Sequence, residues 1–330
     1  LEWLRLYTFP NEAKFADASF AEKAAAVFWP RILSTGTIAG CAYSSIHKEA
    51  LEAALRHAGE HFLVGNVLMT MHSPEALTQT EGEAIELVES LSARFKERYL
   101  ASPRFAPTTG PKVMQAAGGA ARVHGSFIQT HLSETPAEIA WVTEMYREFE
   151  GFEDVATYTE IYDRVGLLGP RTLMGHVIHL SAGEWRRLAE TDTVAVSCPT
   201  SNAPLPELGL GSGLFDFRVA DGYGVRWALA TDIGGGPFLS MFDVMQSFVA
   251  QNAAAGVSEA TRVRALYRST QASAEILEKG DRIGNFAPGK EASFIHVPLD
   301  ASAELTDAEG VLEAILAQHV NDRAAYELSL

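Results

Sequence analysis

Three residues whose side chains can bind metal or move protons each end a short apolar, β-prone run: His131, His176 and Asp232. Catalytic zinc takes nitrogen and oxygen ligands and keeps one position for water. A zinc-bound water with a pKa near ~7 is a hydroxide nucleophile at neutral pH. A lone histidine usually has no such role, but three candidates at three strand ends favour a hydrolytic metal site. His131 and Asp232 are the candidate ligands.

Glu134 stands three residues after His131 and has two interpretations. Its carboxylate could move protons between an activated water and a substrate. The run 133–136 also resembles a helix entry, where acidic residues stabilise the first turn. The residues alone leave both interpretations open, and the nearness of His131 favours proton transfer.

Arg104 and Phe105 stand together in the short strand predicted over residues 104–106. A guanidinium beside an aromatic ring suits a flat heterocycle that carries a carbonyl group. A surface arginine next to a core phenylalanine fits the same residues equally well.

Four other features have simpler interpretations. His179 is expected in a loop, and Glu184 is expected to cap a helix that begins at Ser181. Cys198 has no adjacent base, which favours a buried, inert thiol. The glycines of residues 231–236 could cradle a phosphate, but they match neither a P-loop nor G-x-G-x-x-G. We expect them to turn the backbone tightly beneath a substrate.

The elements that must position these residues alternate between strands and helices with short connections, which is typical of α/β folds. Strands are predicted over residues 36–45, 61–69, 104–106, 126–131, 172–176, 193–197 and 225–231. Helices are predicted over residues 11–32, 48–58, 81–100, 136–149, 158–168, 182–190, 237–252 and 258–277, with another from about Pro111.

Seven predicted strands are one fewer than in an eight-stranded (β/α) barrel, whose chemistry sits at the carboxyl ends of the strands. We therefore expect a TIM-like (β/α)8 barrel over residues 1–280, with its first strand absent from this sequence. The chain opens directly on an amphipathic pattern, and we expect further sequence upstream. Residues 281–330 are expected outside the barrel, with a strand over 292–297.

Composition narrows the function classes. The net charge of −16 argues against nucleic acid and anionic membranes, because both bind to basic patches. Two cysteines cannot make a disulfide framework, which favours a reducing, cytoplasmic compartment. No apolar run approaches the ~20 residues needed to span a bilayer.

Several segments, in order along the chain, match those of one known family. They are residues 7–10 (YTFP), 36–39 (GTIA), 103–108 (PRFAPT), 129–134 (QTHLSE), 175–181 (GHVIHLS), 198–202 (CPTSN), 210–215 (LGSGLF), 230–234 (ATDIG) and 283–292 (IGNFAPGKEA). On these segments the chain resembles the guanine deaminases of the amidohydrolase superfamily. The first and third are fairly specific to that branch, whereas the histidine and aspartate strand ends are shared by the superfamily.

The resemblance implies hydrolysis of guanine to xanthine and ammonia at one Zn²⁺ per chain, with Fe²⁺ as an alternative. His131 and Asp232 would be ligands, and His176 would hydrogen-bond the attacking water or the substrate. Glu134 would carry a proton to a ring nitrogen, and Asp232 would also accept one. Arg104 and Phe105 would help to hold the purine, which would also contact His131, Glu134 and Asp232.

The resemblance also implies a cytoplasmic homodimer in purine metabolism. A small β-sandwich would be built from both termini, and residues 281–330 would contribute to it. No partner beyond the purine is implied.

Three departures from the family pattern stand out. The His-x-His pair of its first strand and a glutamine just beyond it are absent here, and we expect them upstream. The loop from Asn202 to Leu210 looks longer than usual and could alter specificity. Thr109 stands where cysteine or serine is commoner.

Two other functions stay open. One is a related deaminase or chlorohydrolase that acts on an adenosine-like or triazine heterocycle. The other is a metal-deficient, non-catalytic barrel with a binding or assembly role, because the sequence lacks two of the family's ligands.

Overall fold

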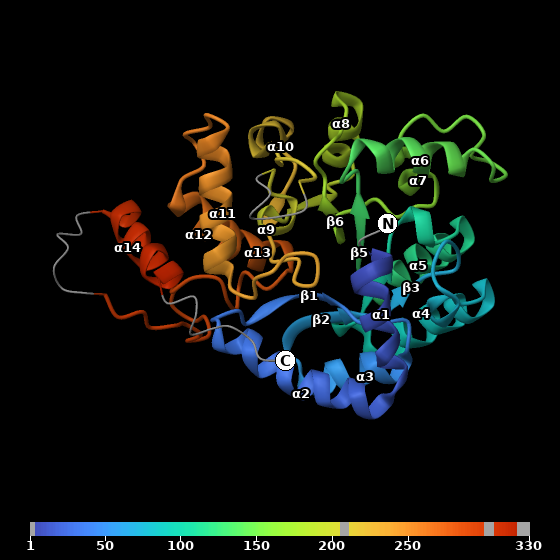
Figure 1. The fold of residues 1–330 in the computed structure, drawn as a ribbon, viewed down its shortest axis with the longest axis horizontal. Helices are drawn as coiled ribbons and strands as arrows, with labels where there is room; N and C mark the ends of the chain where they lie inside the picture. The colour runs from blue at the N-terminus through green and yellow to red at the C-terminus, as the bar shows by residue number, and fades with distance from the viewer. Residues whose placement is uncertain (1–3, 205–210, 300–306, 322–330) are drawn as a thin grey trace. The chain divides into compact units, whose positions relative to one another are not determined.

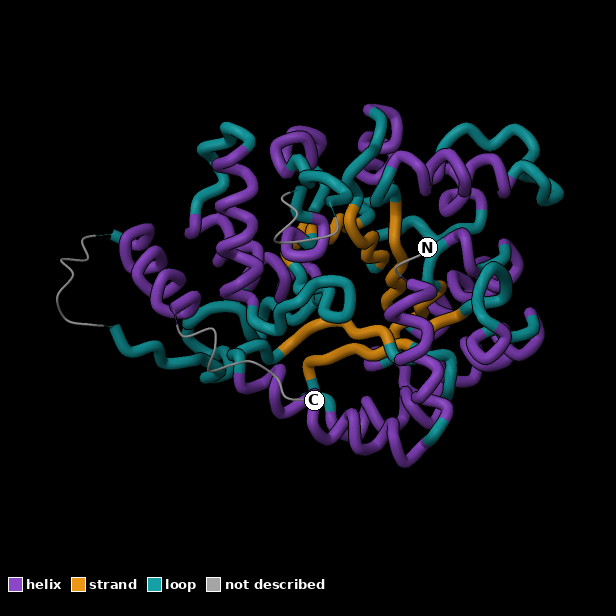
Figure 2. The backbone as a smooth tube through the Cα atoms, viewed as in Figure 1, coloured by secondary structure: helices purple, strands orange, loops and turns teal. Residues whose placement is uncertain are grey.

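The computed structural model describes residues 4–204, 211–299 and 307–321. They divide into two compact units. The first contains residues 4–34, 38–196 and 215–226; the second contains residues 35–37, 197–204, 211–214, 227–299 and 307–321. Figure 1 labels the helices and strands, and Figure 2 shows the same chain by type of secondary structure.

Parallel strands run through the first unit. Their bounds are β1 Ala39–Tyr43, β2 His61–Gly65, β3 Val67–Leu68, β4 Leu100–Pro103, β5 Phe127–Leu132, β6 Thr172–His176 and β7 Val194–Ser197. β1 pairs with β2, and β3 to β7 lie side by side in sequence order. A bridge between Val64 and Tyr99 links β2 to the start of β4. Consecutive parallel strands of this kind build (β/α) barrels, and the predicted α/β fold is confirmed.

Helices connect these strands. Their bounds are α1 Phe9–Glu12, α2 Ala18–Ser34, α3 Lys48–His57, α4 Glu81–Phe95, α5 Pro111–His124, α6 Pro136–Tyr146, α7 Tyr158–Arg164, α8 Ala182–Glu190 and α10 Phe217–Tyr223. Capping boxes begin α4, α6 and α8, in which a hydroxyl and a glutamate satisfy the first backbone amides. The box at α8 consists of Ser181 and Glu184, so the predicted cap is confirmed.

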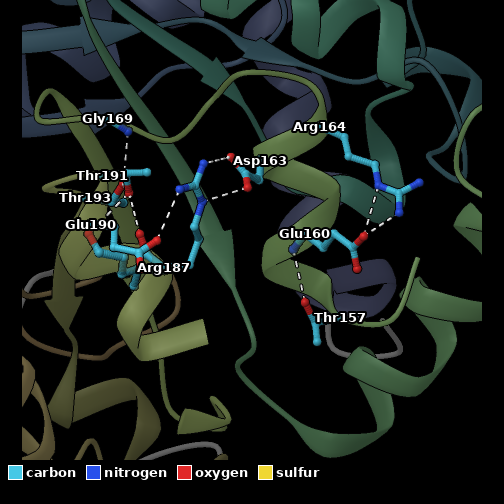
Figure 3. Close-up of polar contacts among 10 residues, drawn as sticks. Thr157, Glu160, Asp163, Arg164, Gly169, Arg187, Glu190, Thr191 and Thr193 are labelled. Carbon is cyan, nitrogen blue, oxygen red and sulfur yellow. Dashed lines mark hydrogen bonds and ion pairs between the residues drawn. The ribbon is translucent and has the colours of Figure 1, made fainter. Parts of the chain in front are cut away.

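An ion pair joins α7 to α8, and hydroxyl groups make further contacts near them (Figure 3). Arg187 on α8 binds both carboxylate oxygens of Asp163 on α7, at 2.7 and 2.8 Å. The hydroxyl of Thr193 accepts the Gly169 amide at 2.9 Å, just ahead of β6. These contacts join the segments that precede and follow β6 in the chain.

The second predicted strand, residues 61–69, is interrupted at Asn66 and forms β2 and β3. Asn66 accepts a hydrogen bond from the buried Tyr99 hydroxyl. Just before it, β2 approaches β4 so closely that a Cβ on Gly65 would lie 1.9 Å from the Leu100 carbonyl oxygen. Glycine is therefore required at position 65 by the close approach of two backbones.

The second unit is mainly helical. Its elements are α9 Pro199–Asn202, β8 Trp227–Leu229, α11 Met241–Ala254, α12 Arg262–Ser269, α13 Gln271–Ile276 and α14 Ala308–Asn321. The Ala230 amide donates to the Ser197 carbonyl at 2.9 Å. The Glu309 carboxylate accepts the first amides of α12, and His319 lies 3.0 Å from Asp243, so α14 is tied to α11 and α12.

Several predicted bounds are wrong. The strand predicted over residues 104–106 is β4, which covers Leu100–Pro103, because the buried apolar residues precede Arg104. The helix predicted over 81–100 ends at Phe95. Residues 291–299 have no regular secondary structure, so the strand over 292–297 is not formed; a strand needs a hydrogen-bonded neighbour. Helices α9, α10 and α14 were not predicted.

Two further predictions concern the loop after Asn202 and membrane spans. Within the loop predicted to be long, residues 205–210 lie outside the described residues. Among the helices that the structure describes, none has both the length and the apolar character required to cross a membrane.

Candidate active site

His131 lies in β5, opposite Gly175 of β6. Its Nδ1 is 2.7 Å from the carbonyl oxygen of Arg104. Because a carbonyl oxygen only accepts hydrogen bonds, Nδ1 carries the proton and Nε2 keeps its lone pair. Metal-binding histidines are commonly oriented by such a bond from their other ring nitrogen. His131 therefore fits a metal ligand that binds through Nε2.

Three rings surround the His131 imidazole. Tyr43 stacks on it with centroids 5.2 Å apart, His176 lies at the same distance, and Phe105 lies at 6.1 Å. Burial, followed by the charge of His176, holds the pKa of His131 well below its ordinary value. The imidazole is thus kept neutral, which is the form that binds metal.

Glu134 and His176 face one another, with Oε2 of the carboxylate 3.7 Å from Nε2 of the imidazole. The loops that carry them are joined by backbone hydrogen bonds. The Ser133 carbonyl accepts the amides of Ile178 and His179 at 3.2 and 3.1 Å. The predicted pairing of a carboxylate with strand-end histidines is therefore present, and His179 lies in a loop as expected.

Glu134 does not cap the helix that follows it. The cap of α6 consists of Thr135 and Glu138, and Glu138 also accepts the Glu134 amide at 3.1 Å. Glu138 therefore has the helix-capping role that was one interpretation of Glu134. The Glu134 carboxylate faces His176 instead.

The backbone is strained where the candidate residues stand. Ser133, His176 and Val177 have φ of +51°, +72° and +50° in the first unit, and Asp232 has +48° in the second. Such conformations disfavour residues with a Cβ and cost about 1–3 kcal/mol each. Strain of this kind collects at functional sites, where backbone hydrogen bonds hold it in place.

Arg104 follows β4 and is largely buried, with 13% of its side chain exposed. Its Nη1 donates to Glu12 Oε2 at 2.7 Å, and its guanidinium lies 5.3 Å from the centre of the Phe9 ring. The interpretation of Arg104 as a surface arginine is therefore wrong. Arg104 thus orients His131 through its main-chain carbonyl, and its side chain carries a separate guanidinium group.

Tyr162 was missed by sequence reasoning. Its buried hydroxyl donates to the His131 carbonyl at 2.8 Å and accepts the Ala106 amide at 3.0 Å. It also lies 3.1 Å from the Thr130 hydroxyl. The only signal was an aromatic pair four residues apart with Tyr158, which is the usual pattern of a helix packed in a core.

Glu12 was missed as well. It follows the segment Tyr7–Pro10, which carried part of the resemblance, but nothing in the sequence links it to Arg104. The two residues are 92 positions apart.

Asp232 and Cys198 belong to the second unit, whereas the other candidates belong to the first. Asp232 comes after β8, and its carbonyl accepts the amides of Gly235 and Gly236 at 2.9 and 2.6 Å. The tight glycine turn predicted here is confirmed. Cys198 is 5% exposed, so its predicted burial is confirmed.

Comparison with known proteins agrees with this arrangement. The amidohydrolase family model matches residues 2–318. The guanine deaminase of Escherichia coli K12 is 33% identical over 303 residues, which cover 89% of this chain and 66% of that protein. The guanine deaminase of Dictyostelium discoideum is 32% identical, with coverages of 88% and 65%. The chain thus spans slightly less than two thirds of the length of these relatives.

Solved structures give the same result. The E. coli guanine deaminase superposes with a TM-score of 0.85 and 30% identity, covering 96% of this chain and 74% of that one. A guanine deaminase from C. acetobutylicum with bound guanine in the active site gives 0.78 and 28%, with coverages of 89% and 70%. A mutant of the atrazine chlorohydrolase from Arthrobacter aurescens gives 0.74 at 16% identity, covering 90% of this chain and 68% of that one, and so shares the fold.

Proposed function

This chain belongs to the amidohydrolase family, and from that membership we propose that it hydrolyses guanine to xanthine and ammonia. The contact that carries the proposal joins Glu134 Oε2 to His176 Nε2, 3.7 Å apart, and the His176 ring lies 5.2 Å from the ring of His131. It sets a proton-transferring carboxylate next to a neutral, oriented imidazole. Guanine is the favoured substrate because the relatives with 28–33% identity named above are guanine deaminases.

One Zn²⁺ per chain is the metal we propose, with Fe²⁺ as the alternative. When bound, it would act as a Lewis acid that makes water nucleophilic at neutral pH. His131 would hold it through Nε2, and Asp232 is assigned as a second ligand from its place at the end of a strand. The resemblance gives two further ligands to a His-x-His pair, which these 330 residues do not contain.

The side chains divide the remaining work. Glu134 removes a proton from the attacking water and delivers it to a ring nitrogen of the purine, as a general acid–base does. The water oxygen bonds to C2, the amine leaves with a proton as ammonia, and the C2 carbonyl of xanthine remains. His176 hydrogen-bonds the attacking water, and Asp232 accepts the second proton of the water and passes it to the departing amine, so that the C2–N bond breaks with release of NH3.

The purine would lie against Phe105, whose ring is 6.1 Å from that of His131. A flat aromatic surface stabilises a flat heterocycle by stacking. The Arg104 guanidinium would donate hydrogen bonds to the carbonyl oxygen of the base.

The test is ammonia and xanthine release from guanine by the zinc-loaded protein, expressed with its full coding sequence. We expect turnover of guanine well above that of adenine, adenosine and an amino-triazine, and about one zinc per chain, as catalytic zinc sites bind. Loss of activity with a chelator and its return with zinc complete the test. Metal-loaded protein that releases no ammonia from guanine would overturn the proposal.

We also propose a homodimer in the cytoplasm, on the resemblance and on the two cysteines, which favour a reducing compartment. Sedimentation of the purified protein tests the first, and cell fractionation tests the second.

A further inference from the structure

Glu12 is the last residue of α1 and forms a largely buried ion pair with Arg104. Oε2 of its carboxylate accepts from Nη1 of Arg104 at 2.7 Å. The exposed fractions of the two side chains are 12% and 13%. Phe9, three residues earlier on α1, lies beneath the same guanidinium. The helix therefore presents a ring and a carboxylate to one arginine.

The other oxygen of Glu12 is unusual. Oε1 is buried, and it has no hydrogen-bond partner among the described residues. Buried polar atoms nearly always have a partner, and a charged group left without one is costly. One carboxylate oxygen of Glu12 is bonded to an arginine, and the other has no partner among the described residues. The second oxygen can therefore accept a hydrogen bond from the N–H of a ligand.

Arg104 joins this carboxylate to the metal-binding histidine. Its carbonyl oxygen is bonded to His131 Nδ1, and its guanidinium is bonded to Glu12. A base held by the Arg104 guanidinium, as the resemblance implies, would have the Glu12 carboxylate beside that contact. That pair complements a lactam, in which a carbonyl oxygen and an N–H are neighbours.

We propose that Glu12 is both a positioning residue and a specificity-determining residue: it holds Arg104 towards the C6 carbonyl of the purine and accepts the N1–H through Oε1. This inference rests on the function proposed above and names the edge of the substrate that is read. A purine without N1–H would leave Oε1 unpaired. Its binding should fall by about 10- to 100-fold, the value of a charge-assisted hydrogen bond.

Hypoxanthine separates binding from catalysis, because it has the lactam edge but no 2-amino group to lose. The experiment measures by calorimetry the Kd of hypoxanthine and of 1-methylhypoxanthine for the zinc-loaded protein and for Glu12→Gln. The four values form a cycle in which the steric cost of the methyl group cancels. We expect the wild type to prefer hypoxanthine by about 10-fold or more, and Glu12→Gln to reduce that preference to within about 3-fold.

The matched control is Glu22→Gln, which removes a carboxylate that pairs with Arg56 on the surface of the same unit. It should keep the full preference for hypoxanthine. In guanine turnover, Glu12→Gln should raise KM by more than it lowers kcat, because the lost contact is made in substrate and transition state alike. A residue needed only for folding would lower the active fraction and leave KM unchanged.

Each outcome decides the matter. Equal binding of the two ligands by the wild type overturns the inference. This result needs no variant, so the inference can be tested even if Glu12→Gln folds poorly. An unchanged preference in Glu12→Gln overturns it as well. If guanine is not deaminated but the preference is present and lost in Glu12→Gln, the proposed function fails and the role of Glu12 stands. If guanine is deaminated but the wild type binds hypoxanthine and 1-methylhypoxanthine equally, the proposed function stands and the role of Glu12 fails.

Discussion

The His131 imidazole is held by the main chain of Arg104, with 2.7 Å between Nδ1 and the carbonyl oxygen. The end of β4 therefore sets the tautomer of the candidate ligand at the end of β5. Because the acceptor is a backbone atom, substitution of the Arg104 side chain leaves it in place. In the proposed mechanism, metal binding and substrate binding would thus depend on different parts of Arg104: the first on its main-chain carbonyl and the second on its guanidinium.

Replacing His131 by alanine should abolish zinc binding and activity together, because a catalytic zinc site has few protein ligands to lose. His179→Ala is the matched control, since His179 lies in the loop after β6 and has no assigned ligand role. We expect His179→Ala to bind zinc as the wild type does. Metal content after dialysis, measured by atomic emission, checks both, and retained zinc in His131→Ala would contradict the assignment.

Glu134→Gln should keep zinc but lower turnover by ~100-fold or more, because the amide cannot transfer the proton. The control is Glu144→Gln on α6, whose carboxylate is exposed and pairs only weakly with Arg147 at 3.3 Å. It should leave kcat unchanged. Full activity in Glu134→Gln would remove this residue from the mechanism.

The sequence was sufficient for the strands and helices whose signals are local. The bounds predicted for β6 and α8 agree with the structure, because a short apolar run and a Ser181–Glu184 capping box are each contained in a few residues. The same holds for the turn after Asp232, where consecutive glycines permit the tight backbone.

Long-range contacts account for what the sequence did not predict. The break at Asn66 depends on a hydrogen bond with Tyr99, and the burial of Arg104 depends on Glu12, 92 positions away. The strand expected over residues 292–297 had the right residue types, but strand formation depends on a hydrogen-bonded neighbour, which no local pattern reports.

Tyr162→Phe should lower the free energy of unfolding by at least about 2 kcal/mol, because it leaves the Ala106 amide and the His131 carbonyl without this buried partner. Tyr158→Phe removes a hydroxyl bonded to Tyr162 alone and should cost about 1 kcal/mol. Urea unfolding of the two variants gives the comparison. Equal losses would show that the bonds of Tyr162 to Ala106 and His131 do not stabilise the site.

The wild type should lose stability as the pH rises, and Glu138→Gln should remove that loss. Burial, and then the charge of Glu134, raise the pKa of Glu138 to about 7, from 4.5 when exposed. The folded state therefore keeps the proton between these values while the unfolded state releases it, so stability falls through this window by up to about 3 kcal/mol. Glutamine still satisfies the capping position.

Thermal melts from pH 4.5 to 8 test this. The Tm of Glu138→Gln should rise relative to that of the wild type as the pH increases, whereas Glu144→Gln should follow the wild type throughout. Parallel curves for the wild type and Glu138→Gln would mean that Glu138 ionises normally in the folded protein.

Gly65→Ala should destabilise the protein strongly, because the new Cβ would lie 1.9 Å from the Leu100 carbonyl and 2.1 Å from the Ser102 hydroxyl. Backbone must move to relieve such an overlap, and overpacking in a well-packed core costs about 1–3 kcal/mol or more. Gly82→Ala is the matched control: a Cβ there meets nothing within 4 Å, and alanine favours helix α4 by up to about 1 kcal/mol. The two variants should therefore shift the urea midpoint in opposite directions.

Because β4 leads into Arg104, Gly65→Ala should also raise the KM for guanine in the fraction of the protein that folds. A wild-type KM would show that the backbone shift at Gly65 does not extend to the site.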